Sequence, residues 1–123
     1  MMLSEHFSEK EFRCHCGRCE MPTISPELLE VLEELRSEFT ATIIITSGYR
    51  CPEHNKAVGG ELHSKHMEGI AADIKVYDKV KKQTPPEIIY AYLSSRYPAK
   101  YGIGKYRAWT HIDVRPTRAR WEV

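Results

Sequence analysis

Two histidines and one aspartate, His66, Asp73 and His111, are the side chains of this sequence best suited to a catalytic metal site. A catalytic zinc site commonly uses three protein ligands of these types and leaves a fourth position for water. His66 and Asp73 lie in the segment 64–73, and His111 lies in the later segment 109–115. If the three side chains converge, the sequence predicts a small zinc hydrolase; if they do not, they are ordinary polar residues near strand ends.

The residues around these three are also suited to a metal site. Gly69 lets the backbone turn and approach closely before the strand that carries Asp73. Because side chains alternate along a strand, Ala71 shares a face with Asp73, and its small size leaves room for an ion. His111 and Asp113 share a face for the same reason. Asp113 is therefore expected either to take a proton from the activated water or to orient a metal ligand.

The elements that must position these residues can be predicted from local signals. Ser25-Pro26-Glu27 places a cap, a proline and an acid at a helix start, and leucines then recur at helical spacing, which predicts a helix over Pro26 to Phe39. The β-branched segment Thr42 to Thr46 predicts a buried strand. Ile70 to Val76 alternates as a second strand, and 101–106 and 109–114 are expected to form two more, joined by a tight turn.

Three shorter helical segments complete the pattern. One follows Ser8, and another begins at Cys51-Pro52 and ends at Gly59-Gly60, before a loop over 60–67. The third starts at 84–87, and its apolar face is expected to carry Ile88, Ile89, Tyr92 and Leu93. The order of helices and strands lacks the regular alternation of a doubly wound sheet. We therefore expect an α+β fold with a small, mostly antiparallel sheet packed on helices.

Size and charge exclude several classes of function. The chain has 123 residues, which suits one domain, and its 18 basic and 17 acidic residues leave a net charge of +1. This balance argues against a nucleic-acid partner bound through bulk charge. Apolar runs such as 43–45 are far too short to span a bilayer, so no membrane insertion is expected. Residues 1–10 contain no apolar signal region, which predicts a cytoplasmic location as synthesised.

Four cysteines form a separate group: Cys14, Cys16, Cys19 and Cys51. Three of them lie within the segment 14–19, and such a cluster in a cytosolic protein more often binds metal or stays reduced than forms a disulfide. Adding His15 or Cys51 would complete a closed, four-coordinate structural zinc site. The alternatives are reduced thiols under the long helix, or a disulfide, which could join the cluster to Cys51 after export.

The motif S-x-H-x-x-G-x-A-x-D over 64–73, followed by H-x-D at 111–113, resembles the M15 peptidase family. This family includes zinc D-Ala-D-Ala carboxypeptidases and phage L-alanyl-D-glutamate endolysins. The opening segment 7–12, the stretch 47–60 and the hairpin 102–106 are also similar to that family, so the resemblance covers nearly the whole chain. It implies a Hedgehog/DD-peptidase-like fold and one domain over 1–123, with an N-terminal segment carrying the cysteine knuckle (1–24) and a catalytic core (25–123).

The resemblance also implies roles for particular residues. It implies zinc held by His66, Asp73 and His111, and Arg50 binding the carboxylate of the substrate or polarising its carbonyl group, a task that suits the planar guanidinium fork. Ser64 is expected to orient His66 or to touch substrate. Without the resemblance, Arg50 would be interpreted as a solvent-exposed loop charge and Ser64 as a turn former.

One position departs from the family pattern. Several members carry Glu, Asp or His three residues before the last histidine ligand, where this chain has Ala108. That departure leaves Asp113 as the residue expected to move the proton. The function implied is a monomeric peptidase that hydrolyses peptidoglycan stem peptides, at D-Ala-D-Ala or L-Ala-D-Glu, with a zinc-activated water. It would reach the cell wall with a phage holin or by another export route.

Two other functions remain open at this stage. A binding or interaction module on the same fold would keep zinc without hydrolysing anything, as Ala108 permits. A zinc-knuckle interaction protein would bind metal only through its cysteines. Trp121, near the end of the chain, is expected to close over the core.

Overall fold

A five-stranded sheet in the order β1-β2-β4-β3-β5 forms the centre of the computed structural model, which describes residues 1–123. All neighbouring strands pair antiparallel except β3 and β5, which are parallel. The strands are β1 (Thr42–Ser47), β2 (Ala71–Tyr77), β3 (Gly102–Lys105), β4 (Thr110–Asp113) and β5 (Ala119–Glu122). The expected α+β fold with a mostly antiparallel sheet is confirmed.

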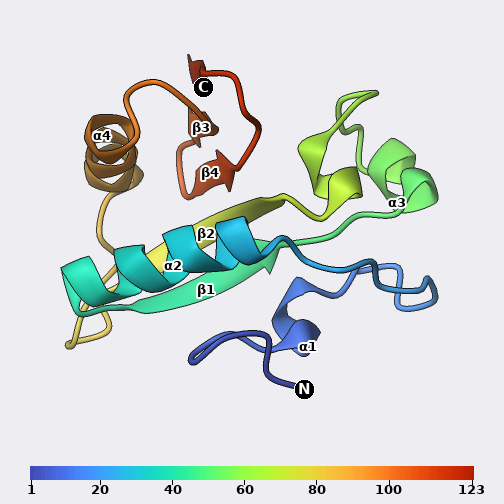
Figure 1. Cartoon of the computed structure of the whole chain (residues 1–123), viewed down its shortest axis with the longest axis horizontal. Coiled ribbons are helices and arrows are strands. Elements are labelled where there is room, and N and C mark those ends of the chain that lie inside the picture. The colour runs from blue at the N-terminus through green and yellow to red at the C-terminus, as the bar shows by residue number, and fades with distance from the viewer.

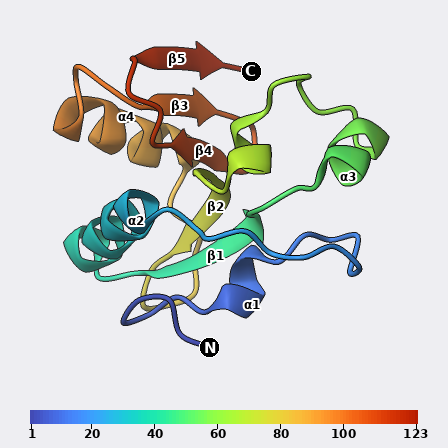
Figure 2. The same ribbon diagram turned by 45° about the vertical axis from the view of Figure 1, so that its right-hand side comes forward.

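Four α-helices and one 3-10 helix surround the sheet (Figure 1). They are α1 (Glu9–Phe12), α2 (Pro26–Phe39), α3 (Pro52–Ala57), η1 (Lys65–Glu68) and α4 (Pro86–Arg96). In Figure 2, α2 lies beside β1 and β2, α4 lies beside β3, and β5 forms one edge of the sheet while the N-terminal segment lies near the other. None of the helices is both long and apolar enough to cross a bilayer.

Helix α2 has the bounds that its local signals predict. The Ser25 hydroxyl accepts a hydrogen bond from the backbone N–H of Leu28, Pro26 occupies the first helical position, and Thr40 ends the helix in the left-handed conformation. Its leucines pack with apolar side chains of α4 and the strands in a single core. Fully buried members of that core are Leu28, Leu32, Leu35, Ile74, Leu93, Ile103 and Ile112.

The pairing of β2 with β4 determines which side chains meet. Asp73 lies directly opposite His111, and Ala71 lies opposite Asp113, in the antiparallel register. Directly opposed residues of neighbouring strands point to the same face, so all four side chains project from one side of the sheet. The intervening residues, such as Ile112, enter the core on the other side. This register places the two strand-borne candidate ligands next to each other.

Two local expectations from the sequence are wrong, and one strand was not predicted. Ile88 was expected on the apolar face of α4 but is 48% exposed, because it lies in the first turn and only Ile89 and Leu93 face the sheet. The expected loop over 60–67 contains the start of η1. The last strand, β5, was not predicted, because its segment Ala119–Glu122 has two charged residues and no apolar alternation.

Candidate metal centre and its cleft

His66, Asp73 and His111 come together from η1, β2 and β4. Their candidate ligand atoms all lie within 4.8 Å of one another. Nε2 of His66 is 3.3 Å from Oδ1 of Asp73, and Nδ1 of His111 is 3.0 Å from the same oxygen. The two imidazole rings lie 5.1 Å apart, edge to face. The three side chains singled out by type and spacing therefore share one site.

The His66 ring is held in one orientation and one tautomer. Its Nδ1 lies 2.7 Å from the carbonyl oxygen of Gly48, and a carbonyl only accepts, so Nδ1 carries the proton. Nε2 is buried and has no hydrogen-bond partner, although Oδ1 of Asp73 lies 3.3 Å away. Buried polar atoms are almost always paired, so this unpartnered lone pair is what a metal ligand requires.

His111 lies between two carboxylates. Its Nδ1 faces Asp73, and its Nε2 lies 2.8 Å from Oδ2 of Asp113. Burial alone would lower the pKa of His111, but hydrogen bonds to Asp113 and Asp73 outweigh burial and raise it. Burial alone would raise the pKa of Asp73, but its close contacts with the imidazoles of His111 and His66 hold it well below its ordinary value. The Asp73 carboxylate is therefore ionised and available to a cation.

Asp113 is completely buried and fully paired. Its Oδ1 accepts hydrogen bonds from the backbone N–H and from Nε of Arg115, at 3.1 and 2.7 Å. Its Oδ2 accepts from Nη2 of Arg115, at 2.7 Å, and lies against His111. Burial alone would raise the pKa of Asp113, but the Arg115 guanidinium lowers it. The carboxylate thus faces Nε2 of His111 and does not line the cleft that opens beside the candidate ligands.

A cleft of about 690 Å³ opens beside the three candidate ligands. One wall is aromatic: Tyr106 stacks on Trp109 at 4.7 Å, and Nε1 of Trp121 donates to the Tyr106 hydroxyl. The Trp121 ring lies 5.1 Å from the His111 ring. Trp121 is therefore a wall of the cleft and only partly buried, where the sequence suggested that it closes over the core.

Arg50 and Ser64, both expected at the substrate, also line the cleft. The Arg50 guanidinium is fixed by hydrogen bonds to the Ser47 hydroxyl, at 3.3 Å, and to Oδ1 of Asn55, at 3.1 Å. Its Nη2 is 3.8 Å from Oδ2 of Asp73, so it lies beside the candidate metal site. The Ser64 hydroxyl accepts a hydrogen bond from the backbone N–H of His66 and caps η1.

Two residues that support the site were not predicted to do so. Asn55 is buried, holds Arg50 with its side-chain oxygen and donates from its side-chain nitrogen to the carbonyl of Glu61. Arg115, two residues after Asp113 in the sequence, neutralises the charge of its carboxylate. A histidine-asparagine pair at 54–55 and an arginine two residues after an aspartate are the only local signals, and both are common in loops.

Two glycines allow the last strands to fit around the site. A Cβ atom at Gly102 would overlap the Asp113 carboxylate and lie 2.6 Å from Nε of Arg115. A Cβ atom at Gly104 would overlap the indole ring of Trp121. Strand β3 therefore needs residues without side chains at both positions, because the side chains of its neighbours cross directly over it.

The four cysteines form a second group, apart from the first site. Cys14, Cys16, Cys19 and Cys51 come within reach of one another although the last is far along the chain, and none forms a disulfide.

Comparison with known proteins identifies a family: a family model described as Peptidase M15 matches residues 5–113. No curated protein sequence matches the chain.

Proposed function

This chain belongs to the peptidase M15 family, and from that membership we propose that it is a zinc-dependent hydrolase of peptidoglycan stem peptides. Family and candidate metal site together support a metallopeptidase. The observation that carries the proposal is the convergence of His66, Asp73 and His111 at an open cleft, with the guanidinium of Arg50 beside them.

The donor set of the site fits zinc. Two imidazoles and one carboxylate are a ligand set typical of catalytic zinc, and the unpartnered Nε2 of His66 lies within 4.8 Å of the other two candidate ligand atoms. We propose that Nε2 of His66, Nδ1 of His111 and the Asp73 carboxylate hold the ion. When bound, zinc supplies a Lewis acid that polarises a carbonyl group and lowers the pKa of a water molecule to about 7.

Arg50 is proposed to bind the substrate. Its guanidinium is pre-oriented by Ser47 and Asn55, so little side-chain freedom is lost when it engages a carboxylate or a carbonyl oxygen. The distance of 3.8 Å to Asp73 places it close enough to act on the same peptide group that the metal would polarise. Ser64, which also lines the cleft, would contact the substrate or only hold the backbone of His66.

Of the two roles open to Asp113, we propose that it positions His111. Its four hydrogen bonds and its complete burial keep the carboxylate away from the cleft, where a reacting water would be. By accepting from Nε2 of His111 it keeps Nδ1 free of a proton and directed at the metal position. Oriented ligands of this kind bind metal more tightly.

Peptidoglycan is proposed as the substrate for two reasons. The sequence resembles enzymes that cut D-Ala-D-Ala or L-Ala-D-Glu bonds, and the cleft offers Arg50, Lys65 and Arg115 to the carboxylates that stem peptides carry. The aromatic wall gives the cleft an apolar side for alanine methyl groups. We propose that the protein acts as a monomer on the wall, after release from the cytoplasm by a holin or another export route.

Digestion of purified peptidoglycan tests this function directly. Zinc-loaded protein is incubated with muropeptides, and mass spectrometry identifies the products. Loss of one terminal alanine would identify a D-Ala-D-Ala carboxypeptidase, and cleavage next to glutamate an L-Ala-D-Glu endopeptidase. His66→Ala is the control and should yield neither product. Intact muropeptides after incubation with the zinc-loaded wild type would exclude the hydrolytic proposal.

A second candidate function is a zinc-containing module that binds the cell wall without hydrolysis. The observation favouring it is the lack of a carboxylate at Ala108, together with the burial of Asp113 away from the cleft. Co-sedimentation of the wild type with intact peptidoglycan, unchanged substrate, and loss of sedimentation in Arg50→Ala would support this candidate over the first.

A further inference from the structure

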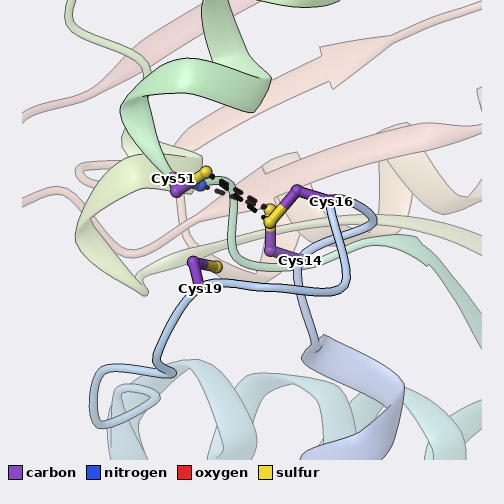
Figure 3. A group of neighbouring side chains, drawn as sticks. All are labelled: Cys14, Cys16, Cys19 and Cys51. Atoms are coloured by element: carbon purple, nitrogen blue, oxygen red, sulfur yellow. Dashed lines mark hydrogen bonds between the residues drawn. The ribbon is translucent and has the colours of Figure 1, made fainter.

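The four cysteine sulfurs meet in one small volume at the side of the molecule that carries the N-terminal segment. Figure 3 shows Cys14, Cys16 and Cys19 on the loop after α1 and Cys51 at the start of α3, with their sulfur atoms directed toward one another. All four Sγ atoms lie within 4.8 Å of each other. Cys14 and Cys51 are buried, and Cys16 and Cys19 are partly buried.

The spacing of the sulfurs matches a tetrahedral thiolate site. Sγ of Cys51 lies 3.8 Å from Sγ of Cys14 and 3.8 Å from Sγ of Cys16. Four sulfurs bound tetrahedrally at about 2.3 Å from a zinc ion would lie about 3.8 Å apart. A disulfide would need two of the sulfurs at about 2.05 Å, far closer than the 3.8 Å of either Cys51 contact. Equal spacing from Cys51 to two different sulfurs favours a shared central ion.

Backbone N–H groups already point at three of the sulfurs. The amide of Arg18 donates to Sγ of Cys16 at 3.4 Å, and the amide of Cys51 donates to Sγ of Cys14 at 3.4 Å. The amide of His54 donates to Sγ of Cys51 at 3.5 Å. Hydrogen bonds of this kind stabilise the charged thiolate, which is the form that binds metal.

The loop is shaped for such a knuckle. Gly17 has a φ of 71°, and a Cβ atom there would meet nothing within 4 Å, so its backbone conformation and not space is what favours glycine. That turn brings the two cysteines of the C-x-x-C unit, Cys16 and Cys19, to the same side. His15 is exposed, and its ring packs against His54 outside the sulfur group, so it is not the fourth ligand.

We propose that Cys14, Cys16, Cys19 and Cys51 bind a second zinc ion in a closed, structural site. Four protein ligands leave no position for water, so this ion has no part in hydrolysis. Its effect is to fasten the loop 13–25, which contains no helix or strand, to the start of α3. This binding would stand even if the proposed peptidase activity failed.

The second site also supports the first one. Cys51 follows Arg50 directly, and the backbone N–H of Arg50 donates to the carbonyl of His66. Two residues earlier, the Gly48 carbonyl accepts from the His66 ring, and between them Tyr49 N–H donates to the carbonyl of Phe12. A metal at the cysteines would therefore fix the segment 48–51, which orients both His66 and Arg50.

Metal content gives the first test. Full-length protein purified with zinc under reducing conditions should contain about two zinc ions per chain by elemental analysis. His66→Ala and Cys19→Ser should each retain about one, at the thiolate site and the histidine site respectively. His15→Ala is the matched control and should retain both. A wild type with a single zinc ion that is lost in His66→Ala would overturn the proposal.

Cobalt substitution tests the identity of the ligands, and its first result comes from the wild type. Cobalt bound to four thiolates gives an intense sulfur-to-metal charge-transfer absorption that a site of two histidines and one aspartate cannot give. The wild type should show this absorption, His66→Ala should keep it, and Cys19→Ser should reduce it. Absence of the absorption in cobalt-loaded wild type, or a Cys14–Cys51 disulfide in protein isolated from the cytoplasm, would contradict the inference.

Discussion

Oδ2 of Asp113 lies 2.8 Å from Nε2 of His111, on the nitrogen that does not face Asp73. The two carboxylates therefore contact different nitrogen atoms of one imidazole ring. Asp73 is placed to share a metal ion with Nδ1, whereas Asp113, held by Arg115, is placed to fix the ring. The two aspartates of adjacent strands therefore have different roles, one as a candidate ligand and the other as a residue that positions a ligand.

Asp113→Asn should weaken zinc binding more than it slows the zinc-loaded enzyme. Removing the charge behind His111 is expected to lower zinc affinity by roughly 10–100-fold. Chelator competition measures the affinity, and turnover of muropeptides at saturating zinc measures the rate. Glu87→Gln, an exposed carboxylate on α4, is the control and should change neither. If Asp113 were the base, turnover at saturating zinc would fall by about 100–10,000-fold with zinc affinity unchanged.

Zinc affinity should fall as the pH drops through the pKa of His111. Proton and metal compete for the same imidazole, and the hydrogen bonds to Asp113 and Asp73 raise this pKa above its ordinary value of about 6.5. Loss of zinc should therefore begin at a higher pH than for an unperturbed histidine, while Asp73, with its lowered pKa, stays ionised. Zinc titrations at several pH values measure this.

The same titrations on Asp113→Asn provide an internal check. Removing one of the carboxylates that raise the pKa of His111 should move to lower pH the point at which zinc affinity starts to fall from its plateau, although the plateau affinity itself is weaker. A zinc affinity that stays constant until the ordinary carboxylate range, near about pH 4, would show that His111 does not compete with protons for the metal.

Gly102→Ala should damage the metal site through the Asp113–Arg115 pair. The added methyl group would overlap the Asp113 carboxylate, which has no free space to move into. Overpacking of this kind is expected to lower the free energy of unfolding by about 1–3 kcal/mol. Thermal denaturation and chelator competition measure stability and zinc affinity. Zinc affinity should fall with stability.

Gly104→Ala is the matched substitution on the same strand. Its methyl group would overlap the Trp121 indole, which borders the cleft, and its nearest contacts would not include the Asp113 carboxylate. We expect it to raise KM for muropeptides while zinc affinity stays near the wild-type value. Equal loss of zinc in both variants would show that β3 itself is disrupted, which would contradict a specific effect of Gly102 on the ligand behind His111.

Arg50→Lys should lower kcat/KM without removing zinc. A lysine has one point charge in place of the guanidinium fork and cannot reproduce its hydrogen bonds to Ser47, Asn55 and substrate together. The loss of one charge-assisted hydrogen bond predicts about a 10–100-fold decrease. Arg118→Lys, an exposed arginine, is the control. An Arg50→Lys enzyme as active as the wild type would show that Arg50 does not contact the reacting group.

Local signals predicted the elements, but long-range pairing determined the site. The helix over Pro26–Phe39 has its predicted bounds because its cap, its proline and its leucine spacing all lie within the segment. The meeting of Asp73 with His111 depends on the register of β2 against β4, and neither strand encodes that register by itself. The resemblance to a family, and not the sequence spacing, predicted that the segments 64–73 and 109–115 meet in one site.

The roles within the site were less predictable than its members. An aspartate two residues after a histidine predicted a shared face, which is correct, but could not show that Arg115 would cover that carboxylate. Strand β5 was missed because its charged residues hide the usual alternation, and with it the position of Trp121 at the cleft.

The hydrogen bond from the His66 ring to the Gly48 carbonyl has a consequence for the order in which the protein matures. Both partners are held by the protein itself, because His66 is buried and its carbonyl accepts from the N–H of Arg50, so we expect the first site to be assembled by folding and then loaded. The cysteine loop has no helix or strand to hold it, so its final shape is expected to form together with ion capture. Zinc limitation during synthesis would therefore leave the N-terminal segment loose before it empties the histidine site.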